Sequence, residues 1–172
     1  MSEIRIVRTG HRPQRDKRVT THVALSSRAL GASGIYIDTK DLVLEENLKS
    51  VTDRFGGDFE IKTGVRWQDV VKDFDGTVVH LTMYGQRFDE AMPNIPRDKD
   101  LVLIVGAEKV PPEVYQRADF NVSVGNQPHS EIAALAIFLY CYTGGKQLYS
   151  DRHGEMTVIP NERGKTVVGN TE

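Results

Sequence analysis

Residues 103–140 read LIVGAEKVPPEVYQRADFNVSVGNQPHSEIAALAIFLY, in which two apolar strands each run into a polar, glycine-containing loop that opens a helix. The first loop holds Gly106 and the charged pair Glu108 and Lys109, and the second runs from Gly125 to Glu131. Open α/β sheets bind their ligands outside the carboxyl ends of the strands. The two loops therefore predict one ligand pocket at a sheet edge, built largely from backbone.

The same alternation of strands and helices runs through most of the chain. It favours an α/β fold, a parallel sheet with helices on both faces. We expect strands at residues 4–7, 34–37, 59–62, 77–82, 101–105 and 120–124, and helices at 20–30, 42–55, 66–74, 112–117 and 130–143. Thr20 or Thr21 is expected to cap the first helix. Residues 146–172 form a C-terminal extension, in which 156–159 and 165–168 predict a small hairpin or an extended arm.

The composition is that of an ordinary globular domain. The 172 residues are 39% hydrophobic and 27% charged, close to average usage. The longest apolar run, residues 132–142, is well short of the roughly 20 residues that a membrane span needs, and the amino terminus lacks a signal-peptide core. We therefore expect a cytoplasmic protein without a membrane segment. The single cysteine, Cys141, excludes an intrachain disulfide, and we expect it to be buried in the last long helix.

Several common cofactor motifs are absent from the sequence. Thr9-Gly10-His11-Arg12-Pro13-Gln14, after the first strand, has a single glycine where a dinucleotide-binding loop needs GxGxxG, and no GxxxxGK[ST] phosphate loop occurs. The five histidines lack metal-ligand spacing such as HxxxH. We predict no metal site.

Basic residues gather near the amino terminus. Arg5, Arg8, Arg12, Arg15, Lys17 and Arg18 lie there with His11, against only Glu3 and Asp16, although the whole chain has a net charge of −2. From charge alone, this cluster is either a solvated face or a surface that meets a polyanion.

Four strings of the sequence are similar to a known enzyme family. They are GHRPQRDKRVTTHVALSSRALGA from Gly10, HLTMYG from His80, IVGAEKVPPEVY from Ile104 and VGNQPHSEIAALAIFL from Val124. They resemble the SPOUT superfamily of knotted methyltransferases and, more closely, the archaeal tRNA ribose 2'-O-methyltransferases that modify cytidine 56. The resemblance extends to about residue 144. Pro128-His129-Ser130-Glu131 stands where the wider 2'-O-methyltransferase branch has Ser-Leu-Asn, so no role of that asparagine carries over.

The resemblance implies residues 1–172 form a single SPOUT domain with a C-terminal trefoil knot, which periodicity cannot reveal. It implies a homodimer that binds S-adenosyl-L-methionine and methylates the 2'-hydroxyl of cytidine 56 in the tRNA T loop. A same-fold methyltransferase for another RNA position and a non-catalytic RNA-binding module are the alternatives. The cofactor-binding residues implied are Leu81, Gly106, Ala107, Glu108, Lys109, Val110, Val124, Gly125, Asn126, Gln127, Pro128, His129, Ser130 and Glu131.

The resemblance also assigns the basic residues. Arg28 matches the motif arginine at the catalytic centre of the family, where it often reaches the cofactor of the partner protomer. We favour a role in gripping phosphate and stabilising the nascent oxyanion over a role as a base. The basic turn then has a partner, since phosphate contacts position an RNA without reading its sequence. The residues expected to contact RNA are His11, Arg12, Arg15, Lys17, Arg18 and His22.

Overall fold

A computed structural model describes residues 2–106 and 109–169. Its main sheet has six parallel strands in the order β3-β2-β1-β5-β4-β6. The strands are β1 (Ile4–Thr9), β2 (Gly34–Ile37), β3 (Glu60–Thr63), β4 (Thr77–Arg87), β5 (Leu101–Gly106) and β6 (Phe120–Ser123). The predicted α/β class with a parallel sheet is confirmed, whereas the trefoil knot stays a prediction.

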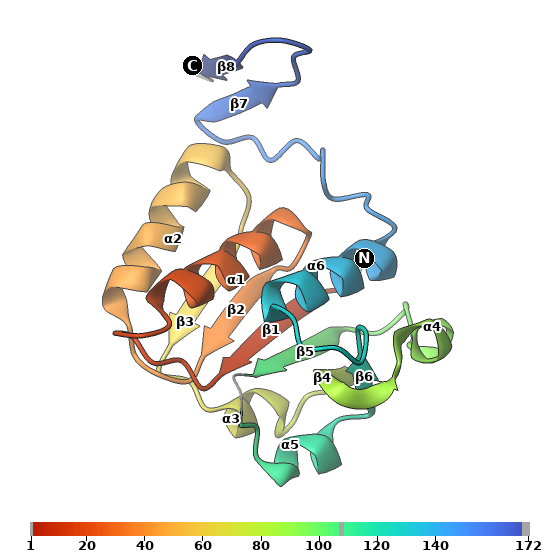
Figure 1. The fold of residues 1–172 in the computed structure, drawn as a ribbon. Helices are drawn as coiled ribbons and strands as arrows, with labels where there is room; N and C mark the ends of the chain where they lie inside the picture. The colour runs from red at the N-terminus through yellow and green to blue at the C-terminus, as the bar shows by residue number, and fades with distance from the viewer. Residues whose placement is uncertain (1, 107–108, 170–172) are drawn as a thin grey trace.

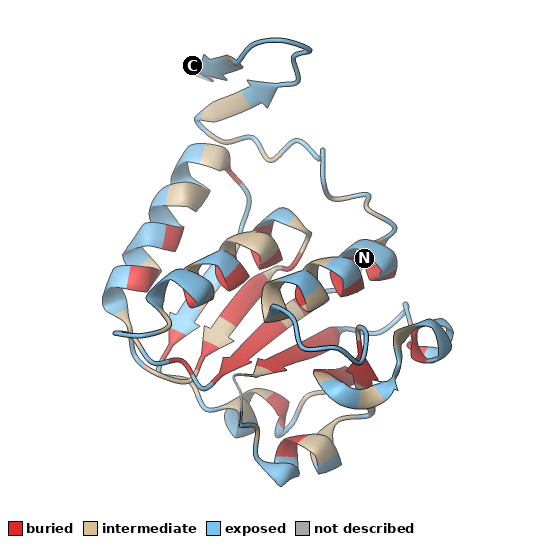
Figure 2. Cartoon of the chain, viewed as in Figure 1, coloured by how far each residue is buried: buried red, intermediate tan, exposed pale blue. Residues whose placement is uncertain are grey.

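Helices cover both faces of this sheet (Figure 1). On one face lie α1 (Lys17–Ala29), α2 (Leu42–Phe55) and α6 (Glu131–Thr143), and on the other lie α3 (Trp67–Val71) and α5 (Pro112–Arg117). A short helix α4 (Phe88–Ala91) and a 3₁₀ turn (Met92–Asn94) link β4 to β5. The central strands are buried on both sides (Figure 2), as in β5, where Leu101 to Val105 are at most 2% exposed. This double coverage explains why the strands read as continuous apolar runs.

The strand order determines which loops meet at the carboxyl edge of the sheet. The chain moves outward from β1 through β2 to β3 and then crosses to β4 on the other side of β1. The order therefore reverses between β1 and β5, the kind of switch point that opens a crevice at the carboxyl ends of strands. A helix that follows a strand begins at this carboxyl edge and ends at the opposite, amino edge.

β4 contains an outward loop that the sequence did not predict. Leu81 and Gln86 both pair with Val122, so residues 82–85 leave the sheet between them. Gly85 is needed at this point, because a Cβ there would lie 2.6 Å from the backbone of Asn121 and Val122. The predicted strand end at Thr82 was right for the regular part of β4, but the chain rejoins β6 afterwards. We call residues 82–85 the β4 loop.

Helix α1 begins earlier than predicted. It starts at Lys17 after Asp16, and neither Thr20 nor Thr21 caps it. Thr20 is instead buried within the helix, and the Thr21 hydroxyl donates to the carbonyl oxygen of Lys17. Capping preference alone could not distinguish a cap from an interior position, because a threonine inside a helix can donate its hydroxyl to a backbone carbonyl one turn earlier.

Helix α6 is apolar all round. Leu135, Phe138, Leu139 and Tyr142 are buried against the sheet, whereas Ala133, Ile137, Tyr140 and Cys141 are exposed on the outer face. The prediction that Cys141 is buried is wrong, because an apolar helix with two apolar faces cannot be oriented from sequence alone. In the described part of the chain, no helix has the length and apolarity to cross a membrane.

The C-terminal extension leaves the main sheet. Strands β7 (Met156–Ile159) and β8 (Thr166–Gly169) pair antiparallel as a separate hairpin, near the end of α2 in Figure 1. Arg152 ties the extension down by donating to the carbonyl oxygens of Arg28 (2.6 Å) and Ala29 (3.0 Å) at the end of α1. A cation is favourable at a helix C-terminus, where carbonyl groups lack partners.

Candidate functional site

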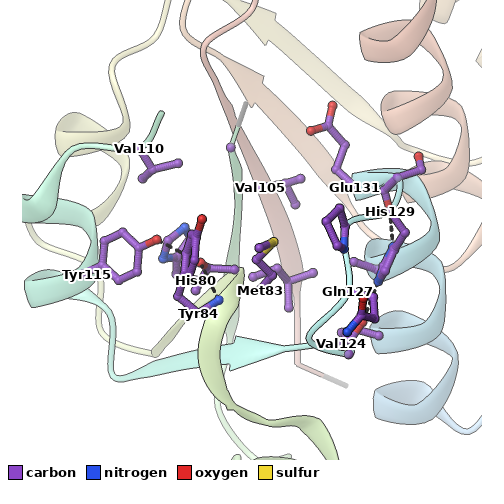
Figure 3. Close-up of a pocket in the computed structure, with 17 residues that line it drawn as sticks. His80, Met83, Tyr84, Val105, Val110, Tyr115, Val124, Gln127, His129 and Glu131 are labelled. Atoms are coloured by element: carbon purple, nitrogen blue, oxygen red, sulfur yellow. Dashed lines mark hydrogen bonds between the residues drawn. The ribbon is translucent and has the colours of Figure 1, made fainter. Parts of the chain in front are cut away.

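A cavity of about 440 Å³ lies at the carboxyl edge of the sheet (Figure 3). It lies where β4, β5 and β6 end and α6 begins. Its lining residues are His80, Leu81, Thr82, Met83, Tyr84, Val105, Gly106, Val110, Tyr115, Val124, Gly125, Gln127, Pro128, His129, Ser130, Glu131 and Ala134. Both loops of the opening sequence stretch therefore contribute to one cavity.

The structure brings most of the predicted cofactor residues together here. Leu81, Gly106, Val110, Val124, Gly125, Gln127, Pro128, His129, Ser130 and Glu131 line the cavity. Lys109 and Asn126 do not line it. Ala107 and Glu108 lie outside the described residues.

The second loop is fixed by His129. Its Nε2 lies 2.6 Å from the carbonyl oxygen of Val124 and its Nδ1 lies 3.0 Å from that of Ser130. Carbonyl oxygens only accept hydrogen bonds, so both contacts are satisfied by the doubly protonated ring. These contacts, first that with Val124, raise the pKa of His129 above its ordinary value. The Ser130 side chain then caps α6 by accepting from the backbone N–H of Ile132 at 3.2 Å.

Glu131 brings a negative charge to the cavity and is held by Arg8, which was not predicted as a site residue. Arg8 Nη2 lies 2.8 Å from Glu131 Oε1, and the Arg8 side chain is 2% exposed. Burial raises the pKa of Glu131, and the charge of Arg8 acts against that rise. Arg8 Nε has no hydrogen-bond partner in the structure. The strand β1 thus supplies a buried cation beside the cavity.

A small polar network supports the β4 side of the cavity. The Asn121 amide donates to the carbonyl oxygen of Tyr115 at 2.9 Å, so its Oδ1 faces His80 Nδ1 at 3.0 Å and accepts. The Tyr115 ring packs edge-on against His80 with centroids 4.7 Å apart. Burial lowers the pKa of His80. His80 is therefore a neutral ring that carries its proton on Nδ1, and its buried Nε2 has no partner in the structure.

Five of the cavity-lining residues that were not predicted from the sequence lie in the β4 loop or face it. Thr82, Met83 and Tyr84 belong to the β4 loop, and His80 and Tyr115 face it from β4 and α5. The string HLTMYG is one of the four that resemble the family, but the resemblance assigns only its Leu81 to the site. The polar exit of this strand, ending in Gly85, was the available signal.

Arg28 does not reach the cavity. It lies in the last turn of α1, at the amino edge of the sheet, and is 8% exposed. Its Nη2 donates to the carbonyl oxygen of Gly56, which ends α2. Burial lowers the pKa of Arg28, and the charge of Arg152 lowers it further. In its own chain Arg28 therefore joins two helix ends outside the cavity, and its catalytic role at the cavity of a second copy stays a prediction.

The basic turn lies at the cavity edge of the sheet, with one correction. His11 is 3% exposed, with Nε2 3.0 Å from Asp41 Oδ2 and Nδ1 2.6 Å from the Thr20 hydroxyl. The expected RNA contact by His11 is therefore contradicted, because both ring nitrogens hold the turn to α1 and α2. The other predicted residues, Arg12, Arg15, Lys17, Arg18 and His22, are exposed. Arg12 forms an ion pair with Asp16, and its hydrogen bonds lower the pKa of that carboxyl to about 2.

No group of three or more His, Cys, Asp or Glu side chains that could hold a metal ion occurs among residues 2–106 and 109–169. The polar groups at the cavity are instead backbone amides and carbonyls, hydroxyl groups, imidazoles, the side-chain amide of Gln127 and one carboxylate. Such a donor set suits an organic ligand with a polar and an apolar part.

Comparison with known families gives this cavity its context. Residues 55–168 match the model of the family described as tRNA ribose 2'-O-methyltransferase, aTrm56. The chain belongs to this family. The matched segment includes β4, β5, β6 and α6, the aTrm56 elements that form the cavity here.

Two aTrm56 relatives carry the name tRNA (cytidine(56)-2'-O)-methyltransferase. The protein of Archaeoglobus fulgidus is 51% identical over 166 residues, which are 96% of this chain and 98% of that protein. The protein of Picrophilus torridus is 54% identical over 164 residues, which are 95% of this chain. This chain spans 48% of the Picrophilus protein's length.

Solved structures share the fold at low sequence identity. The SpoU methyltransferase AviRb from Streptomyces viridochromogenes, solved in complex with the cofactor AdoMet, has a TM-score of 0.60 at 17% identity, covering 88% of this chain and 60% of that one. The A. aeolicus TrmH/SpoU tRNA modifying enzyme has a TM-score of 0.61 at 14% identity, covering 89% and 81%. The aTrm56 chain thus has the fold of these methyltransferases.

Proposed function

We propose that this protein transfers a methyl group from S-adenosyl-L-methionine to the ribose 2'-hydroxyl of cytidine 56 in the T loop of tRNA. The observation that carries the proposal is the cavity at the carboxyl edge, formed by the segments that belong to the aTrm56 family. The relatives named for this reaction are about half identical to the chain over nearly its whole length.

The cavity residues fit this cofactor. Leu81, Val105, Val110, Val124 and Ala134 offer apolar walls, while the backbone of the second loop offers hydrogen-bonding groups. The orphaned acceptor of His80 and the carboxylate of Glu131 are further polar groups there. We assign cofactor binding to Leu81, Gly106, Val110 and the loop Val124–Glu131. When bound, the cofactor supplies an electrophilic methyl group.

The protein's own contribution is positioning. Orienting two reactants can supply about 7–11 kcal/mol of the barrier. His129 holds the second loop in one shape, and Glu131 places a negative charge where a cationic ligand would bind. Arg8 orients this carboxylate, and its charge acts against the rise in the pKa of Glu131 that burial causes. No described residue has to form a covalent intermediate.

The basic turn supplies the grip on RNA. Arg12, Arg15, Lys17 and Arg18 lie before and in the first turn of α1, which starts at the same sheet edge as the cavity. Phosphate contacts from this turn would set the register of the RNA. A T-loop nucleotide splayed out of its stack could then place its ribose at the cavity. His22, exposed further along α1, extends this surface.

The outer face of α6 supports a homodimer. Ala133, Ile137, Tyr140 and Cys141 form an exposed apolar stripe on a helix that is also apolar toward the sheet. Helices that are apolar all round are normally buried. A second copy covering this face would protect Cys141 from a maleimide reagent, and Ile137→Asp would give monomers by light scattering with Cys141 reactive. Reactive Cys141 in a monomeric parent protein would exclude the dimer.

We treat residues 1–172 as one methyltransferase domain with residues 146–172 as its extension, and place the enzyme in the cytoplasm with its tRNA substrate. The deciding experiment incubates the protein with labelled S-adenosyl-L-methionine and an unmodified tRNA transcript, then maps the label by digestion and mass spectrometry. We expect 2'-O-methylcytidine at position 56. A label on a base or on another ribose would overturn the assignment.

A further inference from the structure

The exposed aromatic side chain of Tyr84 lies at the rim of the cavity and does not pack into the core. Tyr84 is 78% exposed although it lines the cavity. It lies in the β4 loop and is labelled in Figure 3. Leaving a large aromatic side chain in water forgoes the stabilisation that its burial would give. Single exposed apolar residues are common on protein surfaces, so exposure alone does not give Tyr84 a function, and its surroundings have to be considered.

The loop under Tyr84 is rigidly built. The Thr82 hydroxyl accepts from the backbone N–H of Tyr84 at 3.3 Å and shares a hydrogen bond of 2.9 Å with the Tyr115 hydroxyl. Tyr115 in turn packs on His80, and the Gly85 backbone lies against β6. The ring of Tyr84 is therefore presented from a supported loop. Aromatic groups held in this way bind with little loss of conformational freedom.

The other aromatic rings at the cavity are occupied. Tyr115 shares its hydroxyl with Thr82, His80 is bonded to Asn121, and His129 is bonded to two carbonyl oxygens. Among the aromatic rings of described residues that line the cavity, only the Tyr84 ring forms no side-chain hydrogen bond. It is also exposed to solvent, from which an RNA would approach.

We propose that Tyr84 is the stacking platform for the base of the target nucleotide. The inference rests on the proposed function, since a ribose whose 2'-hydroxyl reaches into the cavity leaves its base, attached at the neighbouring ring carbon, at the rim. Proteins that recognise splayed-out nucleotides stack the unpaired bases on aromatic side chains. Because every base has a π face, Tyr84 positions the nucleotide and does not choose cytidine.

Steady-state kinetics and calorimetry test this role with Tyr84→Ala, Tyr84→Phe and a matched control, Tyr149→Ala. Tyr149 is 90% exposed and does not line the cavity. Stacking is worth about 1–3 kcal/mol per base, so Tyr84→Ala should lower kcat/KM for tRNA by roughly 5- to 150-fold. Tyr84→Phe should stay within about twofold of the parent, because the ring is kept. All variants should bind S-adenosyl-L-methionine as the parent does.

A binding readout without turnover separates stacking from other defects. A tRNA with fluorescent pyrrolocytidine at position 56 is bound in the presence of S-adenosylhomocysteine. Emission should stay quenched in complexes of the parent and Tyr84→Phe and rise with Tyr84→Ala, where the splayed-out base is unstacked. Equal emission from all complexes would overturn the proposal.

The outcomes for the inference and for the proposed function differ. If the parent protein binds no cofactor or methylates no tRNA, the proposed function fails. If the parent is active but Tyr84→Ala weakens cofactor binding as much as methylation, Tyr84 covers the cofactor and the inference is wrong. Unchanged kinetics in Tyr84→Ala would also overturn it.

Discussion

The ion pair between Arg8 and Glu131 is asymmetric, because the Arg8 side chain is 2% exposed and that of Glu131 is 25% exposed. Removing Glu131 leaves the buried, charged guanidinium of Arg8 without its carboxylate partner. Removing Arg8 leaves a carboxylate that can bind a proton or water. We expect Glu131→Ala to lower the free energy of unfolding by about 3 kcal/mol and Arg8→Met to lower it by less. Urea denaturation of both single variants and the double variant measures this. Equal losses in the two single variants would contradict the asymmetry.

His129 gives cofactor binding a predicted pH dependence. A histidine with a raised pKa keeps both hydrogen bonds below its ordinary pKa of 6.5 and loses one as the pH rises through the raised value. Affinity for S-adenosylhomocysteine should therefore weaken with rising pH, as calorimetry between about pH 6 and pH 9 would detect. Glu131 also titrates at the cavity, so His129→Gln is the control, and its profile should lack the His129 step. If the parent protein and His129→Gln showed the same dependence of affinity on pH, His129 would not be the group that stabilises the loop.

Single residues also mark how far the sequence could predict the site. The loop from Val124 to Glu131 was predicted almost completely, because its glycine, polar residues and following apolar helix are adjacent in the chain. Arg8 and His80 were missed because their roles depend on partners from distant segments, Glu131 and Asn121. His11 was misassigned because a histidine in a basic turn carries no mark of the buried Asp41 and Thr20 contacts.

Among the secondary-structure elements, strands and long helices were predictable, but the orientation of a helix relative to the site was not. The apolar runs gave all six strands of the main sheet because that sheet is buried on both faces. Arg28 matches the sequence motif, but it lies in the last turn of α1. The sheet topology places that end of the helix at the edge opposite the cavity. The β4 loop was missed because an alternating strand pattern does not reveal where a chain leaves and rejoins a sheet.

Arg28 instead joins two helix ends and the C-terminal extension. Its guanidinium caps α2 at Gly56, and its own carbonyl accepts from Arg152. We expect Arg28→Ala to lower the free energy of unfolding by about 1–3 kcal/mol, because the buried Gly56 carbonyl loses a charged donor. Folded Arg28→Ala should still bind cofactor, because Arg28 lies outside the cavity of its own chain, but it should not methylate tRNA if the family's motif arginine acts at the cavity of the second copy. Thermal unfolding and methylation per folded molecule separate the two roles, and full methylation by folded Arg28→Ala would leave Arg28 with the structural role alone.

At the scale of the whole molecule, the net charge of −2 hides a basic edge. The exposed residues Arg12, Arg15, Lys17 and Arg18 lie at the carboxyl edge of the sheet, which also holds the cavity, although the whole chain has 24 Asp and Glu against 22 Lys and Arg. An RNA would therefore be attracted to the edge where the proposed reaction occurs. Net charge alone could not have predicted this, because the sheet topology decides which segments share an edge.

This arrangement makes RNA affinity steeply dependent on salt. Each phosphate contact adds about 0.7–0.9 to the slope of log affinity against log salt concentration. The double variant Arg15→Gln/Arg18→Gln should therefore lower the slope by about 1–2, measured by filter binding of a tRNA transcript across a salt series. Lys49→Gln is the matched control, since Lys49 is 74% exposed on α2 and paired with Asp53. Its slope should equal that of the parent, and an equal fall in both variants would mean that net charge, and not the basic turn, binds the RNA.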